Sequence, residues 1–521
     1  MDSCFSQDQY PGFPKVSSPV TVVSDNNYYP SAKDALEPTV PPILPIFPTN
    51  EARTLILCFD GTGDQFDADN SNIVNFFTML RKDRPEQQMV YYQAGIGTYT
   101  IPQIAKPLTA KFHKLMDAMV GVHLDAHVMG GYEFLMQNCR YFLRFFKRAL
   151  SHYVLFIFIT GFSRGAYTAR ALAGMLHKVG LLPRDNHQQV PFAYKMYSRE
   201  DKTGWEQSAA FKKAFSIDVD IELIGVWDTV GSVGLVPKRL PFTTFNTHVR
   251  HFRQALALDE HRVRFKPTFF NRPTPEEIEL GLKWGEEHNS KKKSKRRQTR
   301  RELERQYPRG QHITTVEEVW FAGCHCDVGG GAVKNEIRNN LSRIPLRWMI
   351  RECFKLKTGI IFHRDSFKMV GLDPTTLWPD VRDRPQPVTT FSRNRPKDKR
   401  DLRILTDNGA FAEIDDFVNE EEEDLADALS KKYDQLKISR SWWILEFIPQ
   451  KIRFQKDDDD KWVQKFSINR GRGRVIPKQR TDGMKIHRTV QLRMQMKVEE
   501  NGKHYKPNAH LIDNVKIEWV K

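Results

Sequence analysis

An apolar run that ends in a glycine-flanked turn, at residues 154–170, constrains the fold more than any other part of the chain. Residues 154–160 are apolar over the length of a strand, and the run Gly161-Phe162-Ser163-Arg164-Gly165 follows at once. Small and apolar residues then recur at helical spacing from Ala166 to Leu176. This strand–turn–helix pattern predicts a nucleophile elbow, in which the two glycines permit a sharp reversal and the hydroxyl of Ser163 is exposed above a sheet. The alternative is a structural turn in which Ser163 only caps the helix.

The rest of the chain supports an α/β fold. With 521 residues, 40% of them hydrophobic, the chain can bury a large core. Strand candidates alternate with helix-like segments, and their apolar character is typical of a sheet covered on both faces. We therefore predict an α/β-hydrolase-like, mostly parallel sheet with helices on both faces. The strand candidates are residues 54–59, 89–93, 154–160, 221–227 and 319–322, and a later helix contains Leu346, Met349, Ile350 and Cys353, with Pro345 in its first turn.

Composition divides the chain into three parts. Residues 1–50 are rich in proline and small polar residues and predict a disordered tail. Residues 51–360 predict the α/β-hydrolase-like catalytic domain, with a basic insertion at about residues 285–310. Residues 361–521, where Trp442 and Trp443 begin an apolar cluster, predict a lid or a C-terminal extension that packs on the core, with or without a role at the site.

Charge is unevenly distributed. The net charge is +16, and eight Lys and Arg residues between positions 291 and 301 supply half of it. Such a run is typical of a solvated insertion, of contact with anionic lipid, or of a nuclear localisation signal, and these readings stay open. The acidic stretch from Glu413 to Asp427 predicts a flexible loop.

Cysteine usage and hydropathy bear on location. The six cysteines are few and scattered, which favours a reducing compartment and thus the cytoplasm, with peripheral membrane contact and nuclear entry left open. The first fifty residues lack the pattern of an export signal, and the longest apolar run is too short to span a bilayer. Cys324 and Cys326 form a lone C-x-C pair, so we expect no zinc site. We expect no cofactor, no other metal and no nucleic-acid partner.

Three residues stand in the order of an α/β-hydrolase triad: a nucleophile, an acid and then a base. Asp228 follows the apolar strand candidate at 221–227, so its carboxylate is expected at the carboxyl edge of the sheet. His325 follows another apolar segment and precedes a glycine-rich loop. We predict that Ser163, Asp228 and His325 are the catalytic residues, with Asp327 as an alternative acid. The competing interpretations are that Asp228 only caps a turn and that His325 is a structural residue.

Acyl transfer also needs donors for the oxyanion. The backbone N–H of Arg164, after the nucleophile, is one candidate, and the loop Asp60-Gly61-Thr62 after the first strand is expected to supply another or to position the substrate. The same loop is similar to the D-x-D-G-T motif of haloacid-dehalogenase-type phosphatases. However, Cys58 stands where that motif needs its nucleophilic Asp, which argues against phosphatase chemistry.

Taken together, six segments resemble the catalytic domain family of type VI secretion phospholipase effectors, an α/β-hydrolase group with many uncharacterised fungal members. The resemblance covers about residues 53–355 and implies Ser163 as nucleophile, Asp228 as acid and His325 as base. It also implies hydrolysis of lipid esters. One stretch, Cys139–Tyr153, departs from the family pattern because it is long, basic and aromatic, which indicates an insertion or a misplaced coding junction. The matching segments are 59–62, 92–98, 161–170, 225–234, 255–260 and 319–331.

These observations predict a serine esterase or lipase that cleaves carboxylic esters, lipid or phospholipid acyl esters in particular, through an acyl-enzyme. The alternative is a non-catalytic α/β module that binds anionic membranes or a protein partner through the basic run and the aromatic C-terminal region.

Overall fold

The structure is a computed structural model, and the residues that it describes are 41–44, 52–96, 124–139, 154–231, 240–271, 304, 313–392, 417–456, 459–476, 483–496, 498–500, 503–511 and 516–521. The chain divides into two units, Met1–Thr39 and Val40–Lys521, and all described residues belong to the second. The basic run at 291–301, nearly all of the predicted tail, and residues 140–153 of the departing segment lie outside the described residues.

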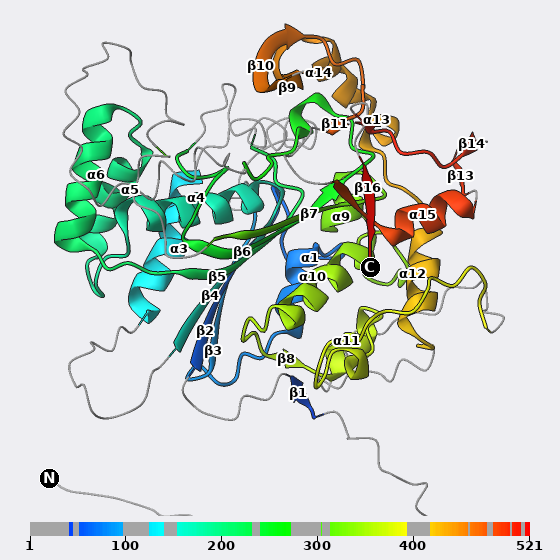
Figure 1. The fold of residues 1–521 in the computed structure, drawn as a ribbon, viewed down its shortest axis with the longest axis horizontal. Coiled ribbons are helices and arrows are strands. Elements are labelled where there is room, and N and C mark those ends of the chain that lie inside the picture. The colour runs from blue at the N-terminus through cyan, green and yellow to red at the C-terminus, as the bar shows by residue number, and fades with distance from the viewer. Residues whose placement is uncertain are drawn as a thin grey trace, which may run out of the picture. The chain divides into compact units, whose positions relative to one another are not determined.

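One eight-stranded sheet forms the centre of the described part (Figure 1). Its strand order is β16-β12-β7-β6-β5-β4-β2-β3, and every pairing of neighbours is parallel. The prediction of an α/β fold with a mostly parallel sheet is therefore confirmed. The strands are β2 (Ala52–Phe59), β3 (Gln88–Gln93), β4 (Val154–Phe162), β5 (Ile221–Trp227), β6 (Val249–Ala257), β7 (Thr315–Phe321), β12 (Met484–His487) and β16 (Ile517–Val520).

Both faces of this sheet are covered, as the apolar strands require. Along β2, Leu55 and Leu57 belong to one hydrophobic cluster, whereas Ile56 and Cys58 belong to a second, because successive strand side chains point to opposite faces. The first cluster packs against α3 (Leu124–Asn138), α4 (Ser163–Val179), α5 (Val190–Ser198) and α6 (Lys202–Phe215). The second packs against α1 (Asn72–Met79), α10 (Arg343–Lys355), α11 (Asp365–Met369) and α12 (Glu420–Ala428) (Figure 1).

The strand order contains one reversal that locates a crevice. The chain runs from β2 outward to β3 and then returns to place β4 on the other side of β2. In a parallel sheet, the loops that leave such a pair of strands diverge and open a crevice at their carboxyl ends. Here those loops begin at Asp60 after β2 and at Ser163 after β4.

The part beyond residue 360 contributes to the sheet itself. β12 pairs with β7, and β16 pairs with β12, so two C-terminal strands extend the sheet at one edge. The domain boundary near residue 360 stays a prediction. None of the described helices is long and apolar enough to cross a membrane. The shorter elements are β1 (Ile43–Leu44), β8 (Phe362–His363), β11 (Val475–Ile476), β13 (Glu499–Glu500), β14 (Lys503–His504), β15 (His510–Leu511), α9 (His325–Gly329), α15 (Arg488–Gln495), η1 (His187–Gln189), η2 (Val263–Phe265), η3 (Pro374–Thr376) and η4 (Arg440–Trp442).

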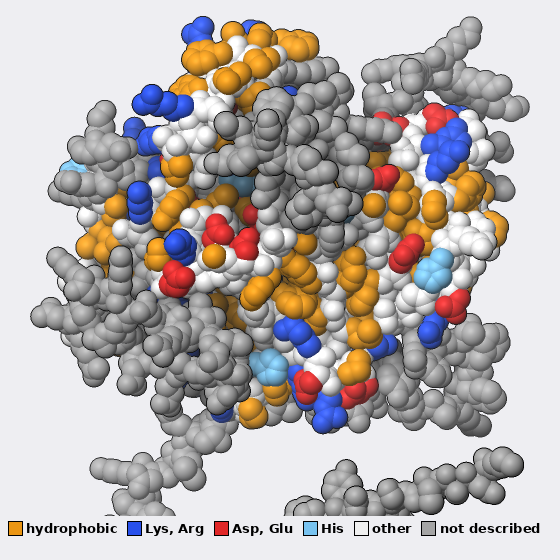
Figure 2. Space-filling view, turned by 180° about the vertical axis from the view of Figure 1, so that it is seen from behind, with side chains coloured by type: hydrophobic (Ala, Val, Ile, Leu, Met, Phe, Trp, Pro, Cys, Tyr) orange, Lys and Arg blue, Asp and Glu red, His pale blue; other side chains and the backbone are white. Residues whose placement is uncertain are grey.

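An apolar surface lies on α13 (Gln435–Ile438), α14 (Trp443–Phe447) and the antiparallel hairpin formed by β9 (Gln450–Lys456) and β10 (Asp459–Ser467). At the top of Figure 2, hydrophobic side chains gather over these elements, with Lys and Arg side chains beside them. We call this the hairpin surface, and its members are each 47–70% exposed: Ile438, Ile444, Phe447, Ile448 and Phe466.

The predicted acidic loop is wrong over its described part, because Glu420–Ala428 form the helix α12. Asn419 caps it by accepting a hydrogen bond from the backbone N–H of Glu422. The carboxylates of this helix are buried, including those of Asp424 and Asp427. A flexible, solvated loop would leave them exposed.

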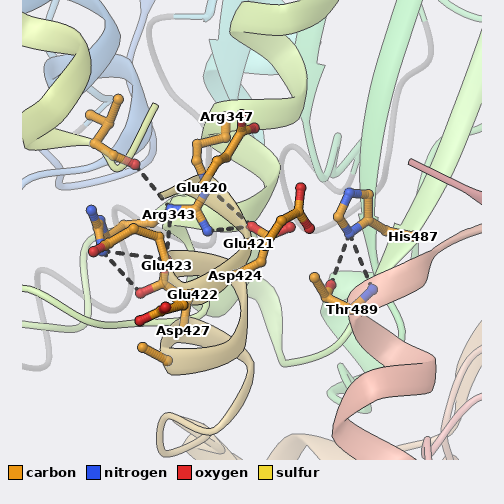
Figure 3. Close-up of polar contacts among 12 residues, drawn as sticks. Arg343, Arg347, Glu420, Glu421, Glu422, Glu423, Asp424, Asp427, His487 and Thr489 are labelled. Carbon is orange, nitrogen blue, oxygen red and sulfur yellow. Dashed lines mark hydrogen bonds and ion pairs between the residues drawn. The ribbon is translucent and has the colours of Figure 1, made fainter. Parts of the chain in front are cut away.

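Arginines from distant segments explain this burial. Arg347 of α10 lies 2.6 Å from Asp424 and 2.7 Å from Asp427, and Arg343 lies 2.8 Å from Glu423. Figure 3 shows α10 and α12 facing each other through these groups. A buried carboxylate is tolerated when it is paired and hydrogen-bonded. The local sequence contains the acids without their partners, so composition alone predicted a loop. The other arginines that pair with this helix are Arg338, Arg351, Arg384 and Arg488.

Candidate active site

Ser163 occupies the sharp turn between β4 and α4. Its φ is 58°, a left-handed value that is costly for a residue with a side chain and is typical of a strained functional turn. The flanking glycines are required by close packing. A Cβ on Gly165 would lie 2.2 Å from the carbonyl oxygen of Phe59, and a Cβ on Gly161 would lie 2.5 Å from the carbonyl of Gly165. The turn between β4 and α4 is therefore sharp and closely packed, and its role as a nucleophile elbow stays a prediction.

His325 is the first residue of α9, directly after the loop that follows β7. Its Nε2 lies 2.8 Å from Ser163 Oγ. The ring is held between two aromatic side chains, with ring centroids 4.6 Å from Phe162 and 4.8 Å from Phe265. The imidazole therefore has a defined orientation toward the serine.

Asp228 follows β5, also with a left-handed φ, of 40°. Its Oδ2 lies 2.6 Å from His325 Nδ1. An ionised carboxylate only accepts hydrogen bonds, so Nδ1 carries the proton and donates it to Asp228. Nε2 is then the acceptor for the Ser163 hydroxyl. The structure thus brings Ser163, His325 and Asp228 into one hydrogen-bonded chain, from residues that are up to 162 positions apart.

Arg474 also contacts the Asp228 carboxylate, and sequence reasoning missed it. Its Nη1 lies 2.6 Å from Oδ1 and its Nη2 lies 2.8 Å from Oδ2. Both side chains are buried. The backbone N–H of Ala257 donates to Oδ1 as well, at 3.0 Å. No local pattern marks Arg474, because it follows the β9–β10 hairpin, 246 residues after its partner.

Burial and these contacts set the protonation of the pair. Burial by itself would raise the pKa of Asp228, but the charge and hydrogen bonds of Arg474 and the contact with His325 outweigh it and lower the pKa to about 2. Burial lowers the pKa of His325, and the hydrogen bond and charge of Asp228 only partly oppose this effect. The acid is therefore ionised and the base is neutral at neutral pH.

The loop after β2 lies next to the elbow, because Phe59 pairs with Gly161 in the sheet register. Asp60 accepts hydrogen bonds from the backbone N–H of Gly61 at 2.8 Å, from Ser71 Oγ at 2.6 Å and from the Tyr92 hydroxyl at 2.7 Å. Burial raises the pKa of Asp60 despite these bonds. Asp60 and Gly61 thus stabilise the loop itself, and Ser71 and Tyr92 are two partners that the sequence did not indicate.

Two polar atoms in this region are buried without a partner: Thr62 Oγ1 and Arg164 Nη1. Burial, together with the charge of Arg264, lowers the pKa of Arg164 to about 10. The backbone N–H of Arg164 is in the first turn of α4, where N–H groups have no acceptor within the helix. An unmatched buried donor is unfavourable unless a ligand completes it. These two residues therefore remain candidates for substrate positioning.

Asp327 does not contact the His325 ring in the structure. Its Oδ2 accepts from the backbone N–H of Cys324 at 2.8 Å and from that of Tyr433 at 3.1 Å. These bonds hold the start of α9 and tie it to the C-terminal part. The matching segment at 92–98 is described only as far as Ile96. Within it, Gly95 packs closely on the loop after β2, because a Cβ added to Gly95 would lie 1.5 Å from the carbonyl oxygen of Gly61. Within the described ranges, no cluster of three His, Cys, Asp or Glu side chains is arranged to hold a metal.

Known proteins show similarity to this chain. The family model described as "T6SS, Phospholipase effector Tle1-like, catalytic domain" matches residues 53–352. The uncharacterized protein YEL023C of Saccharomyces cerevisiae is 28% identical over 552 residues, which cover 82% of this chain and 77% of that protein.

Two solved structures also align with the chain. An uncharacterized protein from Pseudomonas aeruginosa is 17% identical with a TM-score of 0.33, over 59% of this chain and 46% of that one. The Tle1 effector bound to the VgrG spike from the Type 6 secretion system is 16% identical with a TM-score of 0.26, over 54% of this chain and 52% of that one. The alignments span about half the length of these two solved chains.

Proposed function

The chain belongs to the family of Tle1-like phospholipase effector catalytic domains, a family of lipid hydrolases, and on this premise we propose that it is a serine hydrolase that cleaves carboxylic esters, in particular the acyl esters of lipids or phospholipids. The observation that supports this most directly is the 2.8 Å distance between Ser163 Oγ and His325 Nε2, in a pair whose imidazole is oriented by Asp228. A hydroxyl next to a neutral, oriented imidazole is an activated nucleophile.

The proposed reaction has two halves. Ser163 Oγ attacks the ester carbonyl carbon while His325 Nε2 takes the hydroxyl proton. The bond between the carbonyl carbon and the alcohol oxygen then breaks, and His325 returns the proton to the departing alcohol. Water attacks the resulting acyl-enzyme in the same way, which releases the carboxylic acid and restores Ser163. Asp228 keeps the imidazole in the required tautomer and stabilises its charged form.

Charge develops on the carbonyl oxygen in both halves. We assign the backbone N–H of Arg164 to this oxyanion, because it is adjacent to the nucleophile and lies at the positive end of α4. Thr62, whose buried hydroxyl has no partner, is the proposed second contact. Asp60 and Gly61 support the loop that presents Thr62.

The hairpin surface supports the proposal of peripheral contact with an anionic membrane. In the described residues 435–450 and 465–468, three charged side chains are cationic: Lys437, Arg440 and Lys465. The one acidic side chain in these ranges, Glu446, is buried. Apolar side chains flanked by cations match an interface that has an acyl layer below anionic headgroups. The adjoining turn η4 connects this surface to the site, because its Trp442 packs on Phe265 with ring centroids 5.6 Å apart, and Phe265 packs on His325.

The location in a reducing compartment, and so in the cytoplasm, also stays a proposal. Among the described residues it is supported by the free thiols of Cys58, Cys139, Cys324, Cys326 and Cys353, since a compartment that forms disulfides seldom leaves so many thiols unpaired.

Labelling by a fluorophosphonate probe tests the enzymatic proposal. The wild-type chain should be labelled, Ser163→Ala should not, and Ser198→Ala, which changes an exposed hydroxyl near the end of α5, should behave as wild type. Loss of Ser163 should also lower ester turnover by about 10⁴- to 10⁶-fold. Equal labelling of all three chains, or no labelling of a folded wild type, would contradict the proposal. In the second case, retained vesicle binding would favour the non-catalytic alternative.

Vesicle flotation tests the membrane contact. Phe447→Glu combined with Phe466→Glu should weaken binding to phosphatidylcholine vesicles that contain phosphatidylserine by at least about tenfold, because two apolar side chains no longer enter the interface. Phe215→Glu, at an exposed position of α6, is the matched control and should bind as wild type. Cooperative thermal melting establishes that each variant is folded. Equal binding of the double variant and the control would refute this role of the hairpin surface.

A further inference from the structure

Arg474 lies outside residues 53–352, the stretch that the family model matches, and yet it contacts the acid of the site. Its guanidinium is fixed on all sides. Beyond the two contacts with Asp228, Nη1 donates to the carbonyl of Ala257 at 2.9 Å, and Nη2 donates to the carbonyl of Phe265 at 2.6 Å. Only 1% of the Arg474 side chain is exposed, so water screens its charge weakly.

The segment that carries Arg474 is anchored to the same region. Glu446 of α14 accepts hydrogen bonds from the backbone N–H of Val263 at 2.6 Å, from Asn469 Nδ2 at 2.6 Å and from the backbone N–H of Gly471 at 3.0 Å. The loop after β10 is therefore tied to η2, whose Phe265 packs on His325. This support holds Arg474 in place from outside the matched domain.

Four charged side chains face His325 or its immediate partners. Asp228 contacts the ring, and Glu260 accepts from the His325 backbone N–H at 3.3 Å. Arg262 pairs with Glu260 at 2.8 Å, and Arg474 pairs with Asp228. On α9 itself, Asp327 points to backbone N–H groups and has a pKa that burial raises to about 7.

The charges of this group balance. Two carboxylates are matched by two guanidinium groups, so an added proton on His325 meets no net negative charge nearby. Lys266 and the buried carboxylate of Glu446 also interact with this group, and their opposite charges leave the balance unchanged; burial lowers the pKa of Lys266 to about 8. Without Arg474, the same proton would face an excess of one negative charge.

We infer that Arg474 is a positioning residue that fixes the Asp228 carboxylate and, through its charge, lowers the affinity of the Asp228–His325 pair for an additional proton. This inference rests on the proposed function. Its consequence is that the imidazole stays neutral, and able to accept the Ser163 proton, into mildly acidic solution. If Arg474 had only a structural role, replacing it would change the fraction of the chain that folds but not the pH at which the labelling rate is half-maximal.

The experiment measures the rate of fluorophosphonate labelling of the full chain across a pH series. Labelling replaces the fluoride on phosphorus with Ser163 Oγ, while His325 takes the proton, so the rate falls as the pair gains a proton. Each reaction is quenched and read at one fixed pH. In the wild type, the midpoint of this acid limb is expected below the usual pKa of histidine, about 6.5.

Arg474→Met and Arg474→Gln should move the midpoint upward by about one pH unit or more, because a weakly screened positive charge is lost near the pair. Arg474→Lys keeps the charge and should keep the midpoint near that of the wild type, with a slower maximal rate since the two-pronged contact is lost. Arg472→Met, two residues away and exposed, is the matched control.

Circular dichroism at each pH gives the folded fraction of each variant, and the labelling rate is divided by that fraction before the midpoint is compared. An unchanged midpoint in both neutral variants, or an equal shift in the Lys variant, would overturn the inference. If neither neutral variant folds, a wild-type midpoint at or above about 6.5 overturns the inference. Failure of wild-type labelling would instead refute the proposed function.

Discussion

Replacing Gly165 with alanine tests how the elbow depends on close packing between α4 and β2. The added Cβ would lie 2.2 Å from the carbonyl oxygen of Phe59 and 2.3 Å from that of Asp60. An ordinary contact between a carbon and a carbonyl oxygen is about 3.3–3.6 Å, so α4 and the end of β2 must separate by roughly 1 Å. Both oxygens belong to backbone at the carboxyl end of β2, which cannot move as a flexible side chain can.

The size of the effect follows from this overlap. Overpacking in a core costs about 1–3 kcal/mol and occasionally more, while alanine in a helix returns up to about 1 kcal/mol relative to glycine. We expect a net loss of about 2 kcal/mol, or a fall in melting temperature of about 2 °C for a unit of this size. The same separation displaces Ser163 from the loop Asp60-Gly61-Thr62, so labelling by a fluorophosphonate should slow by at least about tenfold.

Gly130→Ala is the matched control. Gly130 is also a helical glycine, in α3, but its added Cβ would meet only the ends of two side chains, those of Tyr91 at 3.0 Å and Gln93 at 3.7 Å. This variant should melt at the wild-type temperature or slightly above and should be labelled at the wild-type rate. If Gly165→Ala matched this control in both measurements, the packing argument for the elbow would be refuted.

Two further predictions concern buried charge. Arg347→Met leaves Asp424 and Asp427 buried without their shared partner, and it should lower the free energy of unfolding by about 3–5 kcal/mol in urea titrations. Arg364→Met, in an exposed pair, is the control and should change the free energy of unfolding by about 1 kcal/mol or less. Similar losses in both variants would contradict the assignment of the α10–α12 contact as a buried ion network. Burial raises the pKa of Asp327 from 3.8 to about 7, so this side chain holds a proton in the folded chain that the unfolded chain releases, and its contribution to stability should fall as the pH rises from about 4 to about 7. Asp327→Asn lacks this loss, and its stability relative to wild type should increase across that pH range; parallel stability curves would show that Asp327 ionises normally.

The parts of the protein that local pattern predicted are those whose partners are close in sequence. The strand before Ser163, the turn and the helix after it are specified by apolar periodicity and by two glycines, all within residues 154–176. The parallel sheet followed for a similar reason, since strands that are apolar on both faces need helices on both sides. The order of Ser163, Asp228 and His325 also indicated a site, and their catalytic roles stay predictions to be tested by labelling.

The failures arose where partners are far apart in sequence. The acidic stretch that forms α12 was predicted to be a loop, because the arginines that pair with its carboxylates come from α10 and from the segments around Arg384 and Arg488. The C-terminal strands β12 and β16 are short, so they gave no strong periodic signal, and the sequence did not show that β12 pairs with β7 and β16 with β12.

The sequence by itself determined the strand, turn and helix around Ser163, the class of fold and which polar side chains were available at the site, because these depend on residue type and short-range spacing. Tertiary structure alone decided that Ser163, His325 and Asp228 meet at hydrogen-bonding distance and that Arg474 shares the Asp228 carboxylate. The physical reason is that charge pairing and burial depend on the distance between atoms, and chain folding sets that distance independently of separation along the sequence.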